Sequence, residues 1–393
     1  MEQKGIILKT IYKHCRIMEK KNDNNTPVRI GITHGDVNGI SYEIIMKAFS
    51  DSRMFDMFTP IVYGSSKVAS YFRKTLNFPD FHFNIIKSAD KAIVRKANLV
   101  NIYPQEIKID LGHCTEIAGK IAYIALEAAV DDLKKGHIDA LVTAPINKQN
   151  IQSKSFNFPG HTEYLAQKFN VEDYLMLMIS NNMRIGVITG HVPLNDVPSL
   201  ITQELILQKI KVFNHALIKD FSIRKPKIAL LGLNPHAGDK GVIGSEEEKV
   251  IIPAIKKAFD DGILAFGPYP ADGFFGSTTY NDFDGILAMY HDQGLIPFKA
   301  LSFKSGVNYT AGLPIIRTSP AHGTAFDIAG KNVAAPDAFR QAIYLAVDCF
   351  RNRKTFEEIT KNPLKFSALE ADSDKDNNLI KDLKKDYNEE PPL

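Results

Sequence analysis

The chain of 393 residues has little of three features that would narrow its class at once: cysteine, net charge and long apolar runs. Its cysteines, Cys15, Cys114 and Cys349, are far apart and form no CxxC pair, so neither a disulfide framework nor a cysteine metal site is indicated. The formal net charge is only +3 and no Lys/Arg block with interleaved aromatics occurs, so nothing favours nucleic acid as a partner. No apolar run reaches the roughly 18 residues of a membrane span. The composition, 44% hydrophobic and 24% charged, is typical of a globular protein of the reducing cytosol.

The two ends of the chain differ from its middle. Residues 1–27 mix mildly apolar and charged segments without the apolar core and small-residue cleavage site of a secretory signal. We predict a poorly ordered N-terminal extension there, with Met18 as an alternative start. Residues 367–393 are dominated by charged side chains and predict a partly disordered tail. The catalytic unit is therefore expected within residues 28–366.

Short β-branched segments alternate with helical ones through the middle of the chain. Strands are predicted at residues 28–33, 138–142, 184–189, 227–232 and 284–289. Apolar residues at helical spacing predict helices between them, for example the helix marked by Ile206, Ile210, Phe213 and Leu217. This alternation favours an α/β fold with mainly parallel strands. The glycines after the first strand do not form GxGxxG, so the dinucleotide-binding fingerprint is missing.

Histidines follow three of the predicted strands. His191 and His291 come directly after apolar runs, or nearly so, and His236 follows another by a few residues. Because parallel strands bring their carboxyl ends to one edge of a sheet, these imidazoles can converge. Three neutral imidazoles suit Zn²⁺ and leave coordination positions open, which is typical of catalytic sites. A structural polar role is the alternative for any single one of them.

Two carboxylates and a group of polar side chains accompany these histidines. Asp272 and Asp292 could orient a histidine, approach the metal or take a proton, and the sequence does not rank these roles. Lys299, Asn308 and Arg317 suit a phosphate or carboxylate, since Arg offers a planar fork and Lys a point charge. The arginine follows an apolar run, and we expect it at the rim of the same site.

His161 and Thr162 open a predicted helix after Pro159-Gly160. They could bind an anion there together with the free backbone N–H groups of the helix N-terminus. A capping role for the threonine, with Glu163 behind it, is the alternative.

An ordered series of motifs resembles the 4-hydroxythreonine-4-phosphate dehydrogenase family, NAD-dependent enzymes of pyridoxal phosphate biosynthesis. The series spans about residues 28–350 and includes TAPINK, PGHTE, LNPHAG, GPYPAD, YHDQGL, GVNYTAGLPIIRTS and HGTAFDIAG. The resemblance implies a homodimer of the isocitrate/isopropylmalate dehydrogenase-like fold, in which two interlocked α/β subdomains flank an active-site cleft. We expect one subdomain at about 28–139 plus 320–366 and the other at about 140–319.

Carried over residue by residue, the resemblance assigns a role to each candidate. It makes His191, His236 and His291 the ligands of one divalent metal ion, zinc in the first place, with Mg, Co and Mn as alternatives. The substrate contacts that it implies are His161, Thr162, Lys299, Asn308 and Arg317. The NAD-binding loop that it implies contains His322, Gly323, Thr324, Ala325 and Asp327. Asp272, Asp292 and Lys299 are the candidate catalytic groups.

The activity implied is NAD- and metal-dependent oxidation of 4-phosphooxy-L-threonine at C3, followed by decarboxylation to 3-amino-2-oxopropyl phosphate. Two alternatives stay open: the same chemistry on erythronate or threonate 4-phosphate, and a metal-dependent hydrolase or acyl/phosphoryl transferase built on an open zinc site. The chain departs from the usual family pattern at three places. THGDVNGISYE replaces TMGDPAGIGPE, Ala321 replaces an Asp, and Asn147 replaces the His of some relatives.

Overall fold

The computed structural model of the chain describes residues 27–181, 183–302 and 304–362. Its contacts divide the chain into two units, residues 1–354 and 355–393, and every strand lies in the first. Apart from residue 27, the predicted N-terminal extension lies outside the described residues, as does the predicted charged tail. Among the described residues, no helix is long and apolar enough to cross a membrane.

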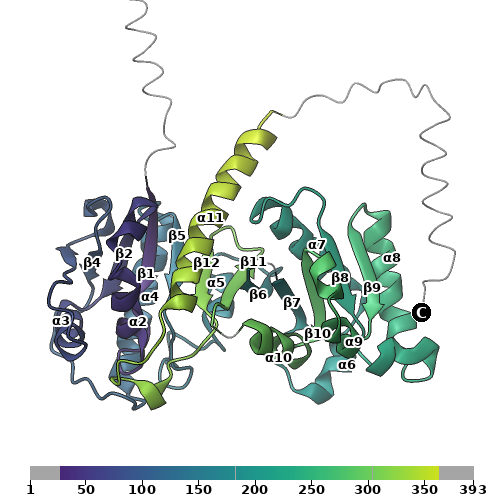
Figure 1. Cartoon of the computed structure of the whole chain (residues 1–393), viewed down its shortest axis with the longest axis horizontal. Helices are drawn as coiled ribbons and strands as arrows, with labels where there is room; N and C mark the ends of the chain where they lie inside the picture. The colour runs from purple at the N-terminus through teal and green to yellow at the C-terminus, as the bar shows by residue number, and fades with distance from the viewer. Residues whose placement is uncertain (1–26, 182, 303, 363–393) are drawn as a thin grey trace, which may run out of the picture. The chain divides into compact units, whose positions relative to one another are not determined.

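The described residues of the first unit form a twelve-stranded sheet (Figure 1). Its strands are β1 (Val28–Thr33), β2 (Phe58–Gly64), β3 (Asn84–Ile86), β4 (Asn98–Asn101), β5 (Ala140–Thr143), β6 (Leu175–Ser180), β7 (Met183–Thr189), β8 (Lys227–Leu231), β9 (Leu264–Tyr269), β10 (Gly285–Tyr290), β11 (Val307–Ala311) and β12 (Arg317–Pro320). They stand in the order β3-β4-β2-β1-β5-β12-β11-β6-β7-β10-β8-β9.

Strand direction divides the sheet into two halves. The strands from β3 to β12 in this order are mutually parallel, and so are β7, β10, β8 and β9. The pairings β12–β11, β11–β6 and β6–β7 between the halves are antiparallel. The predicted α/β class with mainly parallel strands is therefore confirmed. The predicted subdomain boundaries stay a prediction.

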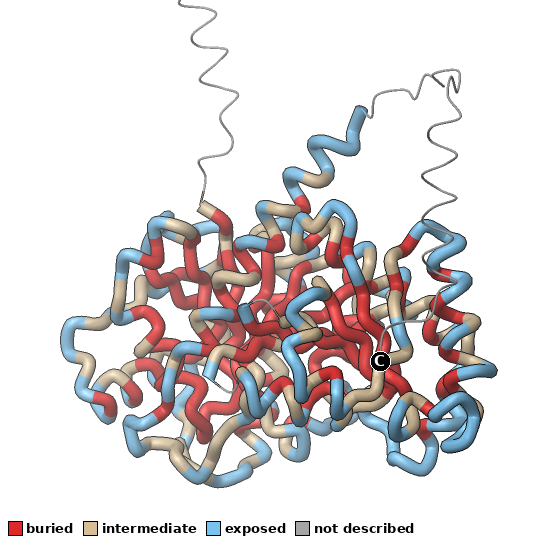
Figure 2. The backbone as a smooth tube through the Cα atoms, turned by 45° about the vertical axis from the view of Figure 1, so that its right-hand side comes forward, coloured by how far each residue is buried: buried red, intermediate tan, exposed pale blue. Residues whose placement is uncertain are grey.

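Helices cover both faces of the sheet. The α-helices are α2 (Ser41–Phe49), α3 (Ser66–Thr75), α4 (Glu116–Lys134), α5 (His161–Lys168), α6 (Val197–Leu200), α7 (Gln203–Lys219), α8 (Ile252–Asp260), α9 (Ala271–Gly276), α10 (His291–Ser302) and α11 (Asp337–Thr360). Shorter helical turns are η2 (Ser52–Asp56), η3 (Ala89–Lys91), η4 (Leu194–Asp196), η5 (Pro235–Gly241), η6 (Glu247–Ile251), η7 (Thr279–Asp282) and η8 (Phe326–Ile328). Figure 2 shows that the buried backbone follows the strands and the inner sides of these helices.

The second half of the sheet shows how strand alternation selects the helix on each face. Leu287 of β10 belongs to the cluster packed by α7, whereas Ala288 belongs to the cluster packed by Leu295 of α10. Successive residues of a strand point to opposite faces, so α7 and α10 lie on opposite sides of β10.

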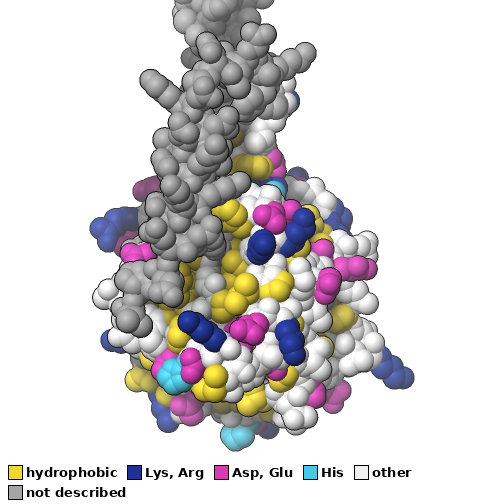
Figure 3. Space-filling view, turned by 90° about the vertical axis from the view of Figure 1, so that its right-hand side faces the viewer, with side chains coloured by type: hydrophobic (Ala, Val, Ile, Leu, Met, Phe, Trp, Pro, Cys, Tyr) yellow, Lys and Arg dark blue, Asp and Glu magenta, His cyan; other side chains and the backbone are white. Residues whose placement is uncertain are grey.

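The strand order of the sheet ends at β9. Figure 3 faces that end of the molecule and shows apolar side chains among charged ones.

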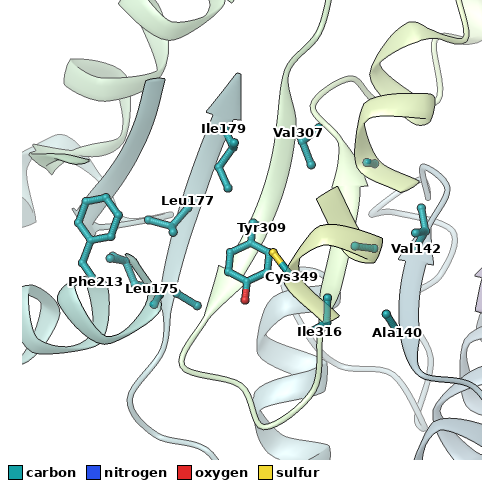
Figure 4. Packing of buried hydrophobic residues seen from close by; sticks show 14 of the residues in the cluster. Ala140, Val142, Leu175, Leu177, Ile179, Phe213, Val307, Tyr309, Ile316 and Cys349 are labelled. Atoms are coloured by element: carbon teal, nitrogen blue, oxygen red, sulfur yellow. The ribbon is translucent and has the colours of Figure 1, made fainter. Parts of the chain in front are cut away.

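The middle strands present one apolar face and one more polar face. Val307 and Tyr309 of β11 lie in the main apolar cluster (Figure 4). Asn308, between them, points to the opposite face, where its register partners are Met178 of β6 and Ser319 of β12. The alternation thus collects polar side chains from neighbouring strands on one surface, while the other surface forms the core.

Candidate active site

A pocket of about 290 Å³ lies on this polar face of the middle strands. It gathers all the predicted substrate contacts: His161, Thr162, Lys299, Asn308 and Arg317. It is also lined by His191 and His291 of the predicted metal ligands and by His322 and Gly323 of the predicted cofactor loop. A larger hollow of about 590 Å³ lies near residues 49–55, 77–84 and 95–97 and contains none of the predicted site residues.

Arg317 is the first residue of β12 and lies at the base of the pocket. Its guanidinium donates to Thr143 Oγ1 at 2.8 and 3.1 Å and to Asn308 Oδ1 at 3.1 Å. Only 4% of the residue is exposed, so the expected rim position is wrong. Arg317 lies within the sheet, where it pairs with Leu141 of β5.

The charge of Arg317 has no carboxylate partner within residues 27–181, 183–302 and 304–362. Burial lowers its pKa to about 10, with the charge of Glu163 acting in the opposite direction, so the group stays cationic at neutral pH. A buried cation held by neutral acceptors is poorly compensated. The pocket therefore favours an anionic ligand.

His161 is held in one tautomer by this arginine. Its Nδ1 lies 3.2 Å from an Arg317 nitrogen, and since a guanidinium can only donate, Nδ1 must accept. Burial, followed by the charges of Arg317 and Lys148, lowers the pKa of His161 well below its ordinary value, so the ring is neutral. The proton then sits on Nε2, which is buried and has no partner among the described residues. His161 thus offers an unused N–H donor to a ligand.

Thr162 does not cap α5, so the alternative reading of that residue is wrong. The N-cap is Gly160, without a side-chain cap, and Thr162 Oγ1 instead lies 3.3 Å from Thr310 Oγ1. The first backbone N–H groups of a helix have no partner inside the helix. With no capping side chain, those of α5 remain available to an anion in the pocket, beside which both Gly160 and Thr162 lie.

His191 and His291 lie at the carboxyl ends of the adjacent parallel strands β7 and β10. Their ring centres are 5.5 Å apart and their planes are inclined by 41°. Two imidazoles on one tetrahedral ion have ring centres roughly 5 Å apart, given metal–nitrogen distances of about 2.0–2.1 Å. The pair therefore fits a shared divalent metal ion.

Each of these histidines has a carboxylate on its Nδ1 side. His291 Nδ1 donates to Asp292 Oδ1 at 2.8 Å, and His191 Nδ1 lies 3.8 Å from Glu163 Oε1. Burial raises the pKa of Glu163, but the hydrogen bond with His191, its own backbone N–H and nearby positive charge outweigh burial and leave the pKa low. Metal-binding histidines usually donate their second nitrogen to such a group, leaving Nε2 for the metal.

His236 does not join this pair. It is exposed in η5, beyond the end of β8, where a run of left-handed residues turns the chain. The loop is held by buried Glu247, whose carboxylate accepts from the backbone N–H groups of Leu233 and Asn234 at 2.8 and 2.7 Å. Among the described residues, no three His, Cys, Asp or Glu side chains are arranged to hold a metal ion. The three-histidine site stays a prediction.

The predicted cofactor loop follows β12 and packs on the glycine-rich turn after β1. Ile40 N donates to Thr324 O at 3.1 Å, and a Cβ on Gly39 would lie 2.6 Å from the same oxygen. Gly323, by contrast, has open space where a Cβ would stand. Nε2 of His322 is buried without a partner among the described residues, and burial lowers the pKa of this ring. The loop thus turns His322 and Gly323 toward the pocket, while Thr324 makes its contact with the turn.

The other predicted residues of the site differ in where they lie. Ala325 has a left-handed backbone (φ 45°) and Asp327 is exposed in η8. Asp272 is exposed in the first turn of α9 and does not line the pocket. Lys299 projects from α10, is exposed and lines the pocket.

Sequence reasoning missed three side chains that the pocket uses. Thr143 orients Arg317, Glu163 approaches His191, and Lys148 lines the pocket beside α5. All three lie inside the motifs TAPINK and PGHTE, one of them at the carboxyl end of β5. The position after a central strand was therefore a usable signal for the TAPINK segment.

Comparison with known proteins gives consistent matches. The family model described as "Pyridoxal phosphate biosynthetic protein PdxA" matches residues 56–346. A 4-hydroxythreonine-4-phosphate dehydrogenase of Bacteroides thetaiotaomicron is 51% identical over 350 residues, which are 89% of this chain and 96% of that protein. A putative D-threonate 4-phosphate dehydrogenase of Oceanobacillus iheyensis is 38% identical over 326 residues, 81% of this chain and 97% of that protein. The crystal structure of 4-hydroxythreonine-4-phosphate dehydrogenase from Klebsiella pneumoniae has 33% identity and a TM-score of 0.72, covering 82% of this chain and 99% of that one.

Proposed function

Because the chain belongs to the family of pyridoxal phosphate biosynthetic protein PdxA, we propose that it is a 4-hydroxythreonine-4-phosphate dehydrogenase. The observation that carries the proposal is one pocket with two kinds of group. A buried arginine that has no carboxylate partner among the described residues lies in it together with a histidine pair spaced for a metal ion. An anion site beside a metal site suits a phosphorylated substrate that carries a reactive hydroxyl.

The reaction converts 4-phosphooxy-L-threonine and NAD to 3-amino-2-oxopropyl phosphate, CO₂ and NADH. Oxidation at C3 moves a hydride from that carbon and releases the hydroxyl proton. The ketone formed lies β to the carboxylate, so the C1–C2 bond then breaks, CO₂ leaves and C2 takes up a proton. When bound, NAD accepts the hydride and a divalent ion acidifies the C3 hydroxyl as a Lewis acid.

The side chains of the pocket position the substrate. Arg317 and the Nε2–H of His161 donate to the phosphate, and this remote binding energy places C3 beside the histidines. His191 and His291 hold the metal ion, with His236 as the predicted third ligand. NAD binds along the loop that begins at His322.

The candidate catalytic groups differ in position. Lys299 lines the pocket, so it is the one best placed to contact the substrate. Asp292 accepts from His291 and suits an orienting role more than proton transfer. Asp272 is exposed away from the pocket lining, and its role stays a prediction.

The test is turnover by the purified protein with 4-phosphooxy-L-threonine, NAD and a divalent metal ion. We expect NADH and CO₂ to form in equal amounts and neither to form when NAD is omitted. Absence of NADH with metal ion supplied would exclude the proposed activity. Release of inorganic phosphate without NAD would favour the hydrolase alternative instead.

The second candidate function keeps the chemistry and changes the substrate. Threonate or erythronate 4-phosphate carries the same phosphate and C3 hydroxyl, with a hydroxyl in place of the amino group at C2. Some relatives carry the putative name of D-threonate 4-phosphate dehydrogenase, at lower identity than the Bacteroides protein. The amino-acid substrate is therefore the one we propose.

A further inference from the structure

We propose that Lys148 is a further substrate-binding residue, which binds the phosphate group together with the N-terminus of α5. The proposal rests on the proposed function, because it takes the ligand to be a phosphorylated substrate. It adds a second cation to the phosphate side of the pocket, beside His161, Thr162 and Arg317, three of the five substrate contacts that the resemblance implies.

The position of Lys148 relative to α5 is the first observation. Lys148 lines the pocket with Gly160, His161 and Thr162, and its Cε lies 4.0 Å from the place where a Cβ on Gly160 would stand. The lysine stem therefore runs beside the uncapped start of α5. This helix end offers backbone N–H groups and the positive end of its dipole, and both favour an anion such as phosphate.

The charge of Lys148 is the second observation. Its ammonium group forms no ion pair with a carboxylate in the three described stretches of chain. After burial and Arg317, it is the next cause that lowers the pKa of His161, and it also acts on Glu163, so it is electrostatically close to both. The unpartnered Nε2 of His161 is an independent sign that a ligand belongs at this place.

The segment that carries Lys148 is fixed on both sides. Asp36 N donates to Pro145 O at 2.8 Å, and the Asp36 carboxylate accepts from Asn150 Nδ2 at 2.7 Å. Asn147 Oδ1 accepts from the backbone N–H groups of Gln149 and Asn150 at 2.9 and 3.1 Å. The backbone at Lys148 is therefore held in place before a ligand binds, which lowers the ordering cost of binding.

Charge matching separates the two anionic groups of the substrate. A phosphate monoester carries roughly −1.5 to −2 at neutral pH, more than one guanidinium can balance. Lys148 and Arg317 both lie at the α5 side, whereas Lys299 comes from α10. We therefore assign Lys148 to the phosphate and leave Lys299 for the carboxylate end.

The experiment compares Lys148→Gln and Lys148→Arg with Lys154→Gln, an exposed lysine close in the chain that does not line the pocket. For Lys148→Gln we expect the KM for 4-phosphooxy-L-threonine to rise by about 10- to 100-fold, typical of a lost charged hydrogen bond. The KM for NAD should be unchanged and kcat should change far less than KM. Inhibition by inorganic phosphate should weaken by a similar factor, Lys148→Arg should recover part of the loss, and Lys154→Gln should match the wild type.

Three results would overturn the assignment: a Lys148→Gln variant that matches Lys154→Gln, a change confined to the KM for NAD, or a raised substrate KM with unchanged phosphate inhibition. Phosphate binding by calorimetry needs no turnover, so it separates this inference from the proposed function. If the wild-type protein binds phosphate but forms no NADH, only the proposed function is contradicted. If the wild type forms NADH but the Lys148→Gln variant binds phosphate as tightly as the wild type, only the inference about Lys148 is contradicted.

Discussion

At the scale of single residues, Arg317 is the group around which the pocket is organised. Its hydrogen bonds with Thr143, Asn308 and His161 fix the guanidinium but supply no negative charge. No carboxylate pairs with Arg317 in the described part of the chain. We therefore expect Arg317 to hold a ligand in place rather than to hold the fold together.

Replacing Arg317 by Ala should lower kcat/KM by about 100-fold or more, the effect of roughly 3 kcal/mol for a charged hydrogen bond. Metal and NAD binding should persist, and Arg317→Lys should recover only part of the activity because a point charge replaces a fork. Steady-state kinetics and thermal unfolding on the same variants check this. Reduced thermal stability with unchanged kcat/KM would give Arg317 a structural role instead.

The next prediction concerns the pH dependence of stability and His34, which stands where many relatives have Met. The ring is fully buried against Tyr42, and burial lowers its pKa from 6.5 to about 4. The folded state therefore resists protonation that the unfolded chain accepts below pH 6.5. Stability should fall as the pH drops from 6.5 toward 4, by about 2 kcal/mol between pH 7 and pH 5 from this ring alone.

His34→Met should remove this contribution while filling the same space with a flexible apolar side chain. Urea unfolding at pH 7 and pH 5 measures it: the loss of stability on acidification should be smaller in the variant than in the wild type. Equal losses in both proteins would show that His34 is not the acid-sensitive group.

At the scale of elements, the sequence predicted the parallel strands well and the antiparallel ones poorly. The apolar segments that became β1, β7, β8 and β10 end in polar residues, so their positions and exposed ends were visible. β6 and β11, the strands between the two halves, were not predicted, and a continuous apolar run such as that of β6 does not distinguish a strand from a buried helical segment. Arg317 was misplaced because β12 begins at this residue and the apolar run before it is not a strand.

We predict that His191 and His291, which follow the ends of β7 and β10, bind a metal ion. Loss of a residue that hydrogen-bonds to a metal ligand typically weakens metal binding by roughly 10- to 100-fold, and we expect a loss of Zn²⁺ affinity in this range for Asp292→Asn. Replacing His191 or His291 by Ala should weaken Zn²⁺ binding by more than this. Chelator competition measures these affinities without turnover. His113→Ala is the matched control, since His113 also pairs with an aspartate, Asp110, but lies outside the pocket lining.

The metal ion should be needed for turnover and not for folding. Protein stripped of metal should keep its circular dichroism spectrum and its cooperative unfolding, because the strand core forms without the site. An unfolded metal-free protein would make the site structural rather than catalytic.

We predict that a bulky residue at Gly323, in the loop after β12, weakens NAD binding. A Cβ there would have no atom of the described residues within 4 Å, so Gly323→Leu should leave thermal stability nearly unchanged and weaken NAD binding by about 10-fold or more through a clash with the cofactor. Gly39→Leu is the contrasting variant, because its side chain would collide with Thr324 O and destabilise the fold. Fluorescence titration with NADH decides the matter, and unchanged affinity in Gly323→Leu would place the cofactor elsewhere.

At the scale of the whole molecule, the sequence predicted which groups share the site but not how they are arranged. His161, Lys299, Asn308 and Arg317 do share one pocket, as the resemblance implied. The tautomer of His161 and the separation of His236 from the other histidines depend on burial and loop geometry, which no local pattern contains. The resemblance supplied the roles, and only the folded chain supplied the distances.

We propose that the chain forms a homodimer through apolar residues beyond the ends of β7 and β10. Leu194 of η4 and Ile296 of α10, which are 70% and 65% exposed, follow the adjacent strands β7 and β10. Light scattering should give twice the monomer mass for the wild type, and Leu194→Asp with Ile296→Asp should shift it toward the monomer. Ile359→Asp, at another exposed apolar residue, is the control, and a monomeric wild type would contradict the proposal.

The most direct test of the central claim is kcat/KM measured with one preparation on three substrates. NAD and a divalent ion are supplied with 4-phosphooxy-L-threonine, threonate 4-phosphate or erythronate 4-phosphate, and NADH formation is followed. We expect the amino-acid substrate to be preferred by about 10-fold or more, about 1.4 kcal/mol in the transition state. A higher kcat/KM for either hydroxy acid, or no NADH from any of the three, would contradict this account.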